Sequence, residues 1–187
     1  DFTEHFVRGI DPADPGSDFF PDGVRDDTVL EVFTVATQTA TTLCPAEDVA
    51  VSAGIAAFLR PEAPIGSPAC PGGPLNGDGD TNDLVVHRWN GMTENLGRAA
   101  TALSLSPTIL AALVSEPGDN AIYNADGLAD DIIVQVHRVA DPPNTWINIG
   151  EPADVVVASG SVAVFITPEA VDGVPRNGDG LADDRVL

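Results

Sequence analysis

The chain has 187 residues, and its 29 acidic against 8 basic residues give a formal net charge of −21. This charge argues against nucleic-acid binding, which needs clustered Lys and Arg, and against docking on an anionic membrane surface. Hydrophobic residues make up 43% of the chain, so we expect a folded protein rather than a disordered one. No apolar stretch reaches the ~20 residues of a membrane-spanning helix, so we expect no membrane insertion.

An acidic nine-residue motif recurs four times along the chain. The copies are FFPDGVRDD (19–27), LNGDGDTND (75–83), YNADGLADD (123–131) and RNGDGLADD (176–184). A run rich in Val, Ile and Leu follows each copy and predicts a β-strand. Such repetition at a nearly constant interval is typical of repeat architectures.

A second repeated block precedes three of the motifs and ends at Glu62, Glu116 and Glu169. Each block has two short apolar runs around a turn of small residues, which predicts a β-hairpin. The stretch 103–114 has helical spacing but contains Pro107 and lies in register with the other hairpins, so we interpret it as strand. A short strand around Leu96 or Ile149 completes two of the units.

These elements predict an all-β fold of repeated four-stranded antiparallel units, similar to β-propeller blades. We expect one repeat domain over 1–187, with units at about 46–99 and 100–150 and partial units at 1–45 and 151–187. The partial units predict open strand edges at both ends. Cys44 and Cys70 predict either one disulfide or two buried thiols.

The second motif places oxygen-bearing side chains at alternating positions around glycines. Calcium takes six to eight oxygen ligands at about 2.3–2.6 Å, whereas the strict octahedron of magnesium suits the loop less well. Without a cation the carboxylates would repel one another. The alternative is that Asn, Asp and Gly serve only as turn formers. The predicted ligands here are Asn76, Asp78, Asp80 and Asp83.

The other motifs depart from this pattern at one or more positions. Leu128 and Leu181 replace the acid at the fifth position, and Arg25 lies among the acids of the first motif. The predicted ligands in these three loops are Asn124, Asp126, Asp130, Asp131, Asn177, Asp179, Asp183, Asp184, Asp22, Asp26 and Asp27.

The pattern N/D-x-D-G-D-x-x-D beside a strand resembles the calcium loops of FG-GAP-type β-propeller repeats, as in integrin α-chains and bacterial surface repeat proteins. The EF-hand fits less well, because glycine occupies position 4 and no Glu stands at position 12. The resemblance implies extracellular propeller or adhesion-type repeats stabilised by calcium.

The sequence contains none of the common catalytic motifs, and we expect no enzyme. His87 and His137, each followed by Arg, are interpreted as a structural pair copied with the repeat. For Glu62, Glu116 and Glu169 we prefer an ion pair with an Arg over a role as metal ligand.

Taken together, these features favour an extracellular or cell-surface structural protein that self-associates head to tail, as a filament or surface-layer subunit joined through open β-edges. A cell-surface or polysaccharide partner is compatible with this hypothesis. The alternatives are a fragment of a larger adhesion or ligand-binding propeller, and a propeller enzyme acting on polysaccharide.

Overall fold

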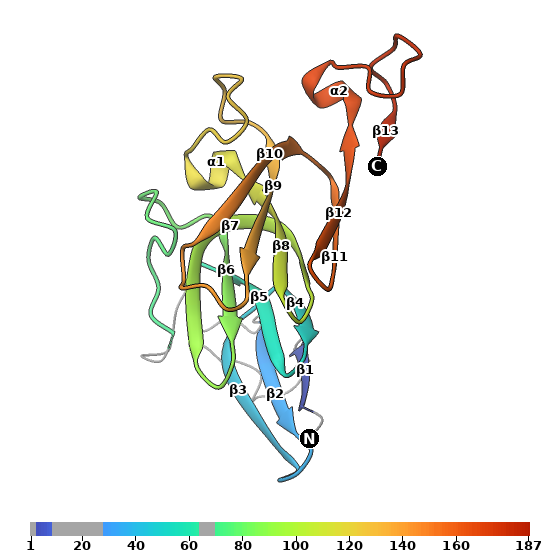
Figure 1. Cartoon of the computed structure of the whole chain (residues 1–187). Helices are drawn as coiled ribbons and strands as arrows, with labels where there is room; N and C mark the ends of the chain where they lie inside the picture. Colours follow the sequence, from blue (N-terminus) through green and yellow to red (C-terminus); the bar gives the residue numbers. More distant parts are fainter. Residues whose placement is uncertain (1–2, 9–27, 64–69) are drawn as a thin grey trace, which may run out of the picture.

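The computed structural model describes residues 3–8, 28–63 and 70–187, which form antiparallel β-sheets with two single-turn helices (Figure 1). The predicted all-β class is therefore confirmed. Neither of these helices is long and apolar enough to cross a bilayer. The first acidic motif, with Asp22, Asp26 and Asp27, lies outside the described residues.

A three-stranded sheet comes first along the chain, in the order β1-β2-β3. Its strands are β1 (Thr3–Arg8), β2 (Val29–Thr34) and β3 (Thr39–Pro45). Cys44 at the end of β3 forms a disulfide with Cys70, so the sequence alternative of two thiols is wrong. The bridge joins this sheet to the segment that leads into the second acidic motif.

The central sheet is a meander of seven neighbouring strands that curls strongly (Figure 1). Ala53 and Gly54, between its first two strands, both have positive φ, as a type I′ hairpin turn requires. In order, the strands are β4 (Asp48–Ser52), β5 (Ile55–Pro61), β6 (Leu84–Trp89), β7 (Thr93–Leu105), β8 (Ile109–Ser115), β9 (Ile132–Arg138) and β10 (Trp146–Pro152).

β7 is the long strand on which the curl depends. Its first half pairs with β6 and its second half pairs with β8. The predicted boundary between units 46–99 and 100–150 falls inside this strand, so the two units share one continuous sheet. The predicted separation into four-stranded blades is not seen in the described strands.

A last, smaller sheet has the order β11-β12-β13 and packs beside the central sheet. Its strands are β11 (Val155–Ser159), β12 (Val162–Pro168) and β13 (Arg185–Val186). The helices α1 (Glu116–Asp119) and α2 (Glu169–Asp172) follow directly after β8 and β12.

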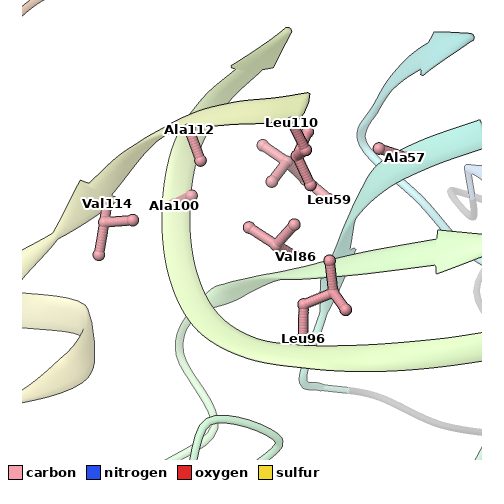
Figure 2. Close-up of a cluster of buried hydrophobic side chains, with 8 residues drawn as sticks. All are labelled: Ala57, Leu59, Val86, Leu96, Ala100, Leu110, Ala112 and Val114. Carbon is pink, nitrogen blue, oxygen red and sulfur yellow. The ribbon is translucent and has the colours of Figure 1, made fainter. Parts of the chain in front are cut away.

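β8 is buried on both faces, because it lies between two apolar clusters. Figure 2 shows the cluster inside the curl, where Leu110, Ala112 and Val114 of β8 meet Leu59 and Leu96. On the opposite face, Ile109, Ala111 and Leu113 pack with residues of β9, β11 and β12. This two-sided burial explains the uninterrupted apolar run, and it confirms that 103–114 is strand on both sides of a turn.

The same backbone hydrogen bond occurs at both ends of the central sheet, directly after a proline. Ala46 follows Pro45 and donates its N–H to the Thr28 carbonyl, and Ala153 follows Pro152 and donates to the Ile132 carbonyl, both at 3.0 Å. Thr28 and Ile132 each follow the last Asp of an acidic motif. Equivalent contacts at equivalent positions therefore accompany the repeated sequence.

Candidate metal centre

Each of the three described acidic loops begins from a glutamate that ends a hairpin. Glu62, Glu116 and Glu169 are all 0% exposed. Their backbone N–H groups donate to the carbonyl oxygens of the last loop residue, at 3.0, 3.0 and 2.8 Å; these acceptors are Asp83, Asp131 and Asp184. In all three cases this backbone hydrogen bond closes the segment that runs from the glutamate to the last Asp of the acidic motif.

The glutamate carboxylates also hold the loops through backbone amides. In the loop at 123–131, the second of the described loops, Glu116 Oε1 accepts the N–H groups of Tyr123 and Asn124, at 2.5 and 3.3 Å. The equivalent amides at 75–76 and 176–177 donate to Glu62 and Glu169. The sequence interpretation preferred an ion pair with Arg for these glutamates, whereas the contacts seen here are to loop amides, which give a buried carboxylate hydrogen-bond donors.

Short side-chain turns shape the loops from within. In the first described loop, Asn76 Oδ1 accepts the N–H of Asp78 at 3.2 Å, and Asp78 Oδ1 accepts the N–H of Asp80 at 3.1 Å. The loops at 124–131 and 177–184 repeat both contacts, with the N–H groups of Leu128 and Leu181 as the second donors. Asn and Asp favour this local geometry, which explains why Leu is tolerated at the fifth position: only its backbone is used.

The loops gather carboxylates into three groups. Within each group, one oxygen per residue lies within 4.8 Å of the others. These groups are Glu62, Asp78, Asp80 and Asp83; Glu116, Asp130 and Asp131; and Asp179, Asp183 and Asp184.

Most of the predicted ligands in the described loops are thus brought together, with exceptions. Asp126 lies outside the second group. The asparagines bind protein groups through their amides: Asn124 Nδ2 donates to Asp131 Oδ2 and Asn177 Nδ2 donates to Asp184 Oδ2, each at 2.5 Å.

Burial and mutual repulsion both raise the pKa values of carboxylates in the loops. The pKa of Asp83 is raised to about 6, first by burial and then by the charges of Asp78, Asp80 and Glu62. Burial also raises the pKa of Asp131, with its acidic neighbours adding to the effect. A cation would favour the charged form of these groups and offset the repulsion.

Glu62 differs from its two equivalents in the use of its second oxygen. Glu116 Oε2 accepts the N–H of Asp131 at 3.2 Å, and Glu169 Oε2 accepts the N–H of Asp184 at 3.4 Å. Glu62 Oε2 is buried and has no hydrogen-bond partner among the residues that the structure describes. A buried carboxylate oxygen without a donor is costly, and this one belongs to the residue that meets three other carboxylates.

The first described loop is also tied to the following unit. Asn76 Nδ2 donates to the Gly118 carbonyl at 2.6 Å and lies 3.3 Å from Asp119 Oδ1. Asp119, whose pKa is raised by burial, accepts the Ala99 N–H at 2.7 Å and the Tyr123 hydroxyl at 2.7 Å. Sequence spacing did not predict this role, because the repeated motif covers the loops and not the single turn between Glu116 and the loop.

Gly118 permits this close approach. A Cβ atom at Gly118 would lie 2.6 Å from Asp83 Oδ1 and 2.8 Å from the Cβ of Ala99. Counted from the repeated glutamate, Val171 of α2 occupies the equivalent position. There, Val171 lines two open cavities of about 210 and 270 Å³ between the second described loop and α2.

The two histidines do not form a repeated pair. Counted from the last Asp of each loop, Gln135 and not His137 occupies the position of His87. Both rings are buried, with Nδ1 of His87 3.0 Å from the Val85 carbonyl and Nδ1 of His137 2.9 Å from the Thr145 carbonyl. The interpretation as a copied pair is therefore wrong, since each ring has its own partner.

Comparison of the chain with protein-family models, with curated proteins and with solved structures gave no match.

Proposed function

We propose that the chain is a calcium-binding repeat protein with a structural, non-enzymatic role outside the cell. The observation that carries this proposal is the group of four carboxylates around Glu62, a fully buried residue with one oxygen that has no partner in the described part of the chain. A divalent cation would supply the missing partner, and it would offset the repulsion that, after burial, raises the pKa of Asp83.

The donor set favours calcium over other common cations. All the grouped ligands are carboxylates. Calcium binds carboxylates in a flexible geometry that backbone carbonyls and water can complete, whereas magnesium needs a near-ideal octahedron. Zinc prefers Cys and His ligands, which these groups lack. The proposed ligands are Glu62, Asp78, Asp80 and Asp83 in the first described site, with the weaker groups in the other two loops.

Two features support a location outside the cell. The Cys44–Cys70 disulfide is of the kind that persists in oxidising compartments. Extracellular calcium is high enough to fill sites with dissociation constants of ~10⁻⁴–10⁻³ M. In this setting we propose that the module works in a self-associated structure, such as a filament or surface layer.

Thermal unfolding with calcium and with excess chelator tests the calcium proposal. A ligand at 100 times its dissociation constant adds about 2.7 kcal/mol. For a chain of this length, each kcal/mol shifts the melting temperature by about 2–4 °C. One filled site should therefore raise it by roughly 5–10 °C over the chelated sample.

Titration calorimetry in the same buffer gives the number of sites and their affinities, with magnesium as the matched control cation. We expect heat from calcium at one strong site before any weaker ones, and a smaller response to magnesium. Equal melting temperatures with calcium and chelator, together with no binding heat, would show that the loops are only turns.

A further inference from the structure

The side-chain amide of Asn76 is used differently from the amides of the two equivalent asparagines. Asn124 Nδ2 donates to Asp131 Oδ2 at 2.5 Å. Asn177 Nδ2 makes the same contact with Asp184 Oδ2, also at 2.5 Å. In both loops the amide therefore occupies an oxygen of the last Asp of the motif, which is a predicted metal ligand. Asn76 Nδ2 points instead to α1, beside which its loop lies (Figure 1).

The Asn76 amide finds two acceptors in α1. Its Nδ2 lies 2.6 Å from the Gly118 carbonyl oxygen and 3.3 Å from Asp119 Oδ1. A side-chain amide carries only two N–H donors. With both donors directed to α1, the amide is held away from Asp83, which is the last Asp of this motif and the equivalent of Asp131.

The pKa values of the two equivalent aspartates agree with this difference. The Asn76 amide has the smallest of the effects on the pKa of Asp83, behind burial and the charges of the neighbouring carboxylates. For Asp131, the effect of the Asn124 amide on the pKa is second only to that of burial. The Asp83 carboxylate is therefore more available to a cation, in the same group as the buried Glu62 Oε2 that has no donor among the described residues.

Asp119 is itself fixed by contacts that do not involve the loop. Its side chain is 4% exposed. It accepts the Ala99 N–H and the Tyr123 hydroxyl, each at 2.7 Å, and Arg98 Nε lies 3.7 Å from its Oδ2. Because three other groups hold this carboxylate in place, it can direct the Asn76 amide.

The glycine before Asp119 permits the arrangement. A Cβ atom at Gly118 would lie 2.6 Å from Asp83 Oδ1, so only glycine lets the loop come this close. In the sequence of α2 an aspartate, Asp172, stands at the position of Asp119, but Val171 replaces the glycine. The loop that precedes α2 keeps its amide on its own last Asp. The aspartate therefore acts on an acidic loop only where a glycine precedes it.

We propose that Asp119 is a positioning residue of the first described calcium site. Together with the Gly118 carbonyl, it holds the Asn76 amide. This leaves the Asp83 carboxylate to the cation. The site is thus completed by the unit that follows it, which is why we expect it to bind more strongly than the other two. The inference rests on the calcium binding proposed above.

A double-mutant cycle, measured by calorimetric titration of the full chain with calcium, tests this role. Asp119→Ala frees one N–H of the Asn76 amide, which can then turn to Asp83 as in the other loops. We expect the affinity of the strongest site to fall at least tenfold. In an Asn76→Ser background, which keeps an oxygen for the turn but has no amide, Asp119→Ala should change the affinity less than about threefold.

Two further variants separate the hydrogen bond from the charge. Glu94→Ala is the matched control, because it removes one carboxylate from the start of β7, where Glu94 pairs with Arg88. It should leave the calcium affinity unchanged. Asp119→Asn keeps an oxygen that can accept from Asn76, so it should recover most of the affinity that Asp119→Ala loses. No recovery, or an equal loss with Glu94→Ala, would mean that only charge matters and would contradict the proposal.

Melting curves in chelator show which variants are folded, and Asp119→Ser replaces Asp119→Ala in the cycle if the alanine variant is not. A purely structural role of Asp119 would lower the melting temperature in chelator but leave the two substitutions additive in calcium affinity. A wild type that gives no calcium heat contradicts the calcium proposal itself. A wild type that binds calcium, with an additive cycle or an undiminished affinity in Asp119→Ala, contradicts the role of Asp119 alone.

Discussion

At the scale of single residues, the repeated glutamates divide into two kinds. Glu116 and Glu169 use both carboxylate oxygens to hold loop amides, whereas Glu62 holds them with one oxygen and has no donor for the other among the described residues. The same residue type at the same repeat position thus supports all three loops, and in one loop it also leaves an oxygen available for a cation. Substitution with Gln separates these roles, because it removes the charge and keeps the size.

Glu62→Gln should leave the melting temperature in chelator unchanged or slightly higher, since it removes one of four repelling charges. It should weaken calcium binding at least tenfold, which is about 1.4 kcal/mol. The matched variant Glu116→Gln should instead lower the melting temperature in chelator, because its second oxygen accepts the Asp131 N–H. Melting curves and calorimetry of both variants check the contrast, and an undiminished calcium shift in Glu62→Gln would exclude it as a ligand.

His87 gives the protein a pH dependence of its own. Burial lowers the pKa of His87 to about 4, from 6.5. The unfolded chain therefore binds more protons between these values, and stability that is complete above pH 6.5 is lost as the pH falls towards 4. Between pH 7.5 and 5 the loss from this residue is about 2 kcal/mol.

His87→Gln should remove this part of the pH dependence, and the substitution is suited to the site because Gln135 occupies the equivalent position. Urea unfolding at the two pH values measures it. The prediction is contradicted if the wild type and the variant lose the same free energy of unfolding on acidification.

At the scale of elements, the single-turn helices determine how closely each acidic loop packs against the helix that follows it. In α1, Gly118 lets the first described loop approach to van der Waals contact. In α2, Val171 stands in the same position and the loop before it stays apart, with open cavities between them. The contact between loop and helix is thus closed where glycine occupies this position and open where valine does.

Gly118→Ala should destabilise the protein by about 1–3 kcal/mol, the usual cost of forcing a group into a packed site. It should also weaken calcium binding, because the added Cβ displaces Asp83. Val171→Ala is the control, and it should change both quantities little since Val171 is 47% exposed. Melting curves with and without calcium test the pair, and equal effects of the two variants would count against this account.

Much of the strand pattern could be predicted from the sequence, because alternating or continuous apolar runs between turn residues reflect burial directly. The hairpins, the strand after each loop and the strand assignment around Pro107 all follow from such local patterns. The fusion of two units into one sheet could not be predicted, since a 13-residue strand that changes partners midway carries no local signal. The curl depends on β7 pairing with β6 at one end and β8 at the other.

The candidate site was predicted only in part, for a related reason. The spacing of Asp and Gly identifies the loops, because those residues act on their near neighbours. The role of Glu62 depends on a backbone that returns to it 13 residues later, and the role of Asp119 depends on contacts with β7. Contacts between residues this far apart in the chain cannot be predicted from the spacing of Asp and Gly within a motif.

At the scale of the whole molecule, the net charge of −21 opposes the compact state. In chelator, raising the salt concentration should screen this repulsion and increase the melting temperature. Saturating calcium neutralises part of the charge, so the same salt increase should have a smaller effect. A salt series with and without calcium measures both slopes, and equal slopes would mean that the cation does not act on the charge.

The unbroken course of β7 has a consequence for how the protein opens. Because this strand belongs to two units at once, neither unit can unfold without pulling hydrogen bonds from the other, and the two form a single cooperative block. At Pro45 and Pro152 the equivalent joints are interrupted by a residue that has no N–H to donate. The β11-β12-β13 sheet can therefore detach first under thermal or mechanical load, while the central block resists as one piece and the Cys44–Cys70 disulfide holds the first sheet to it.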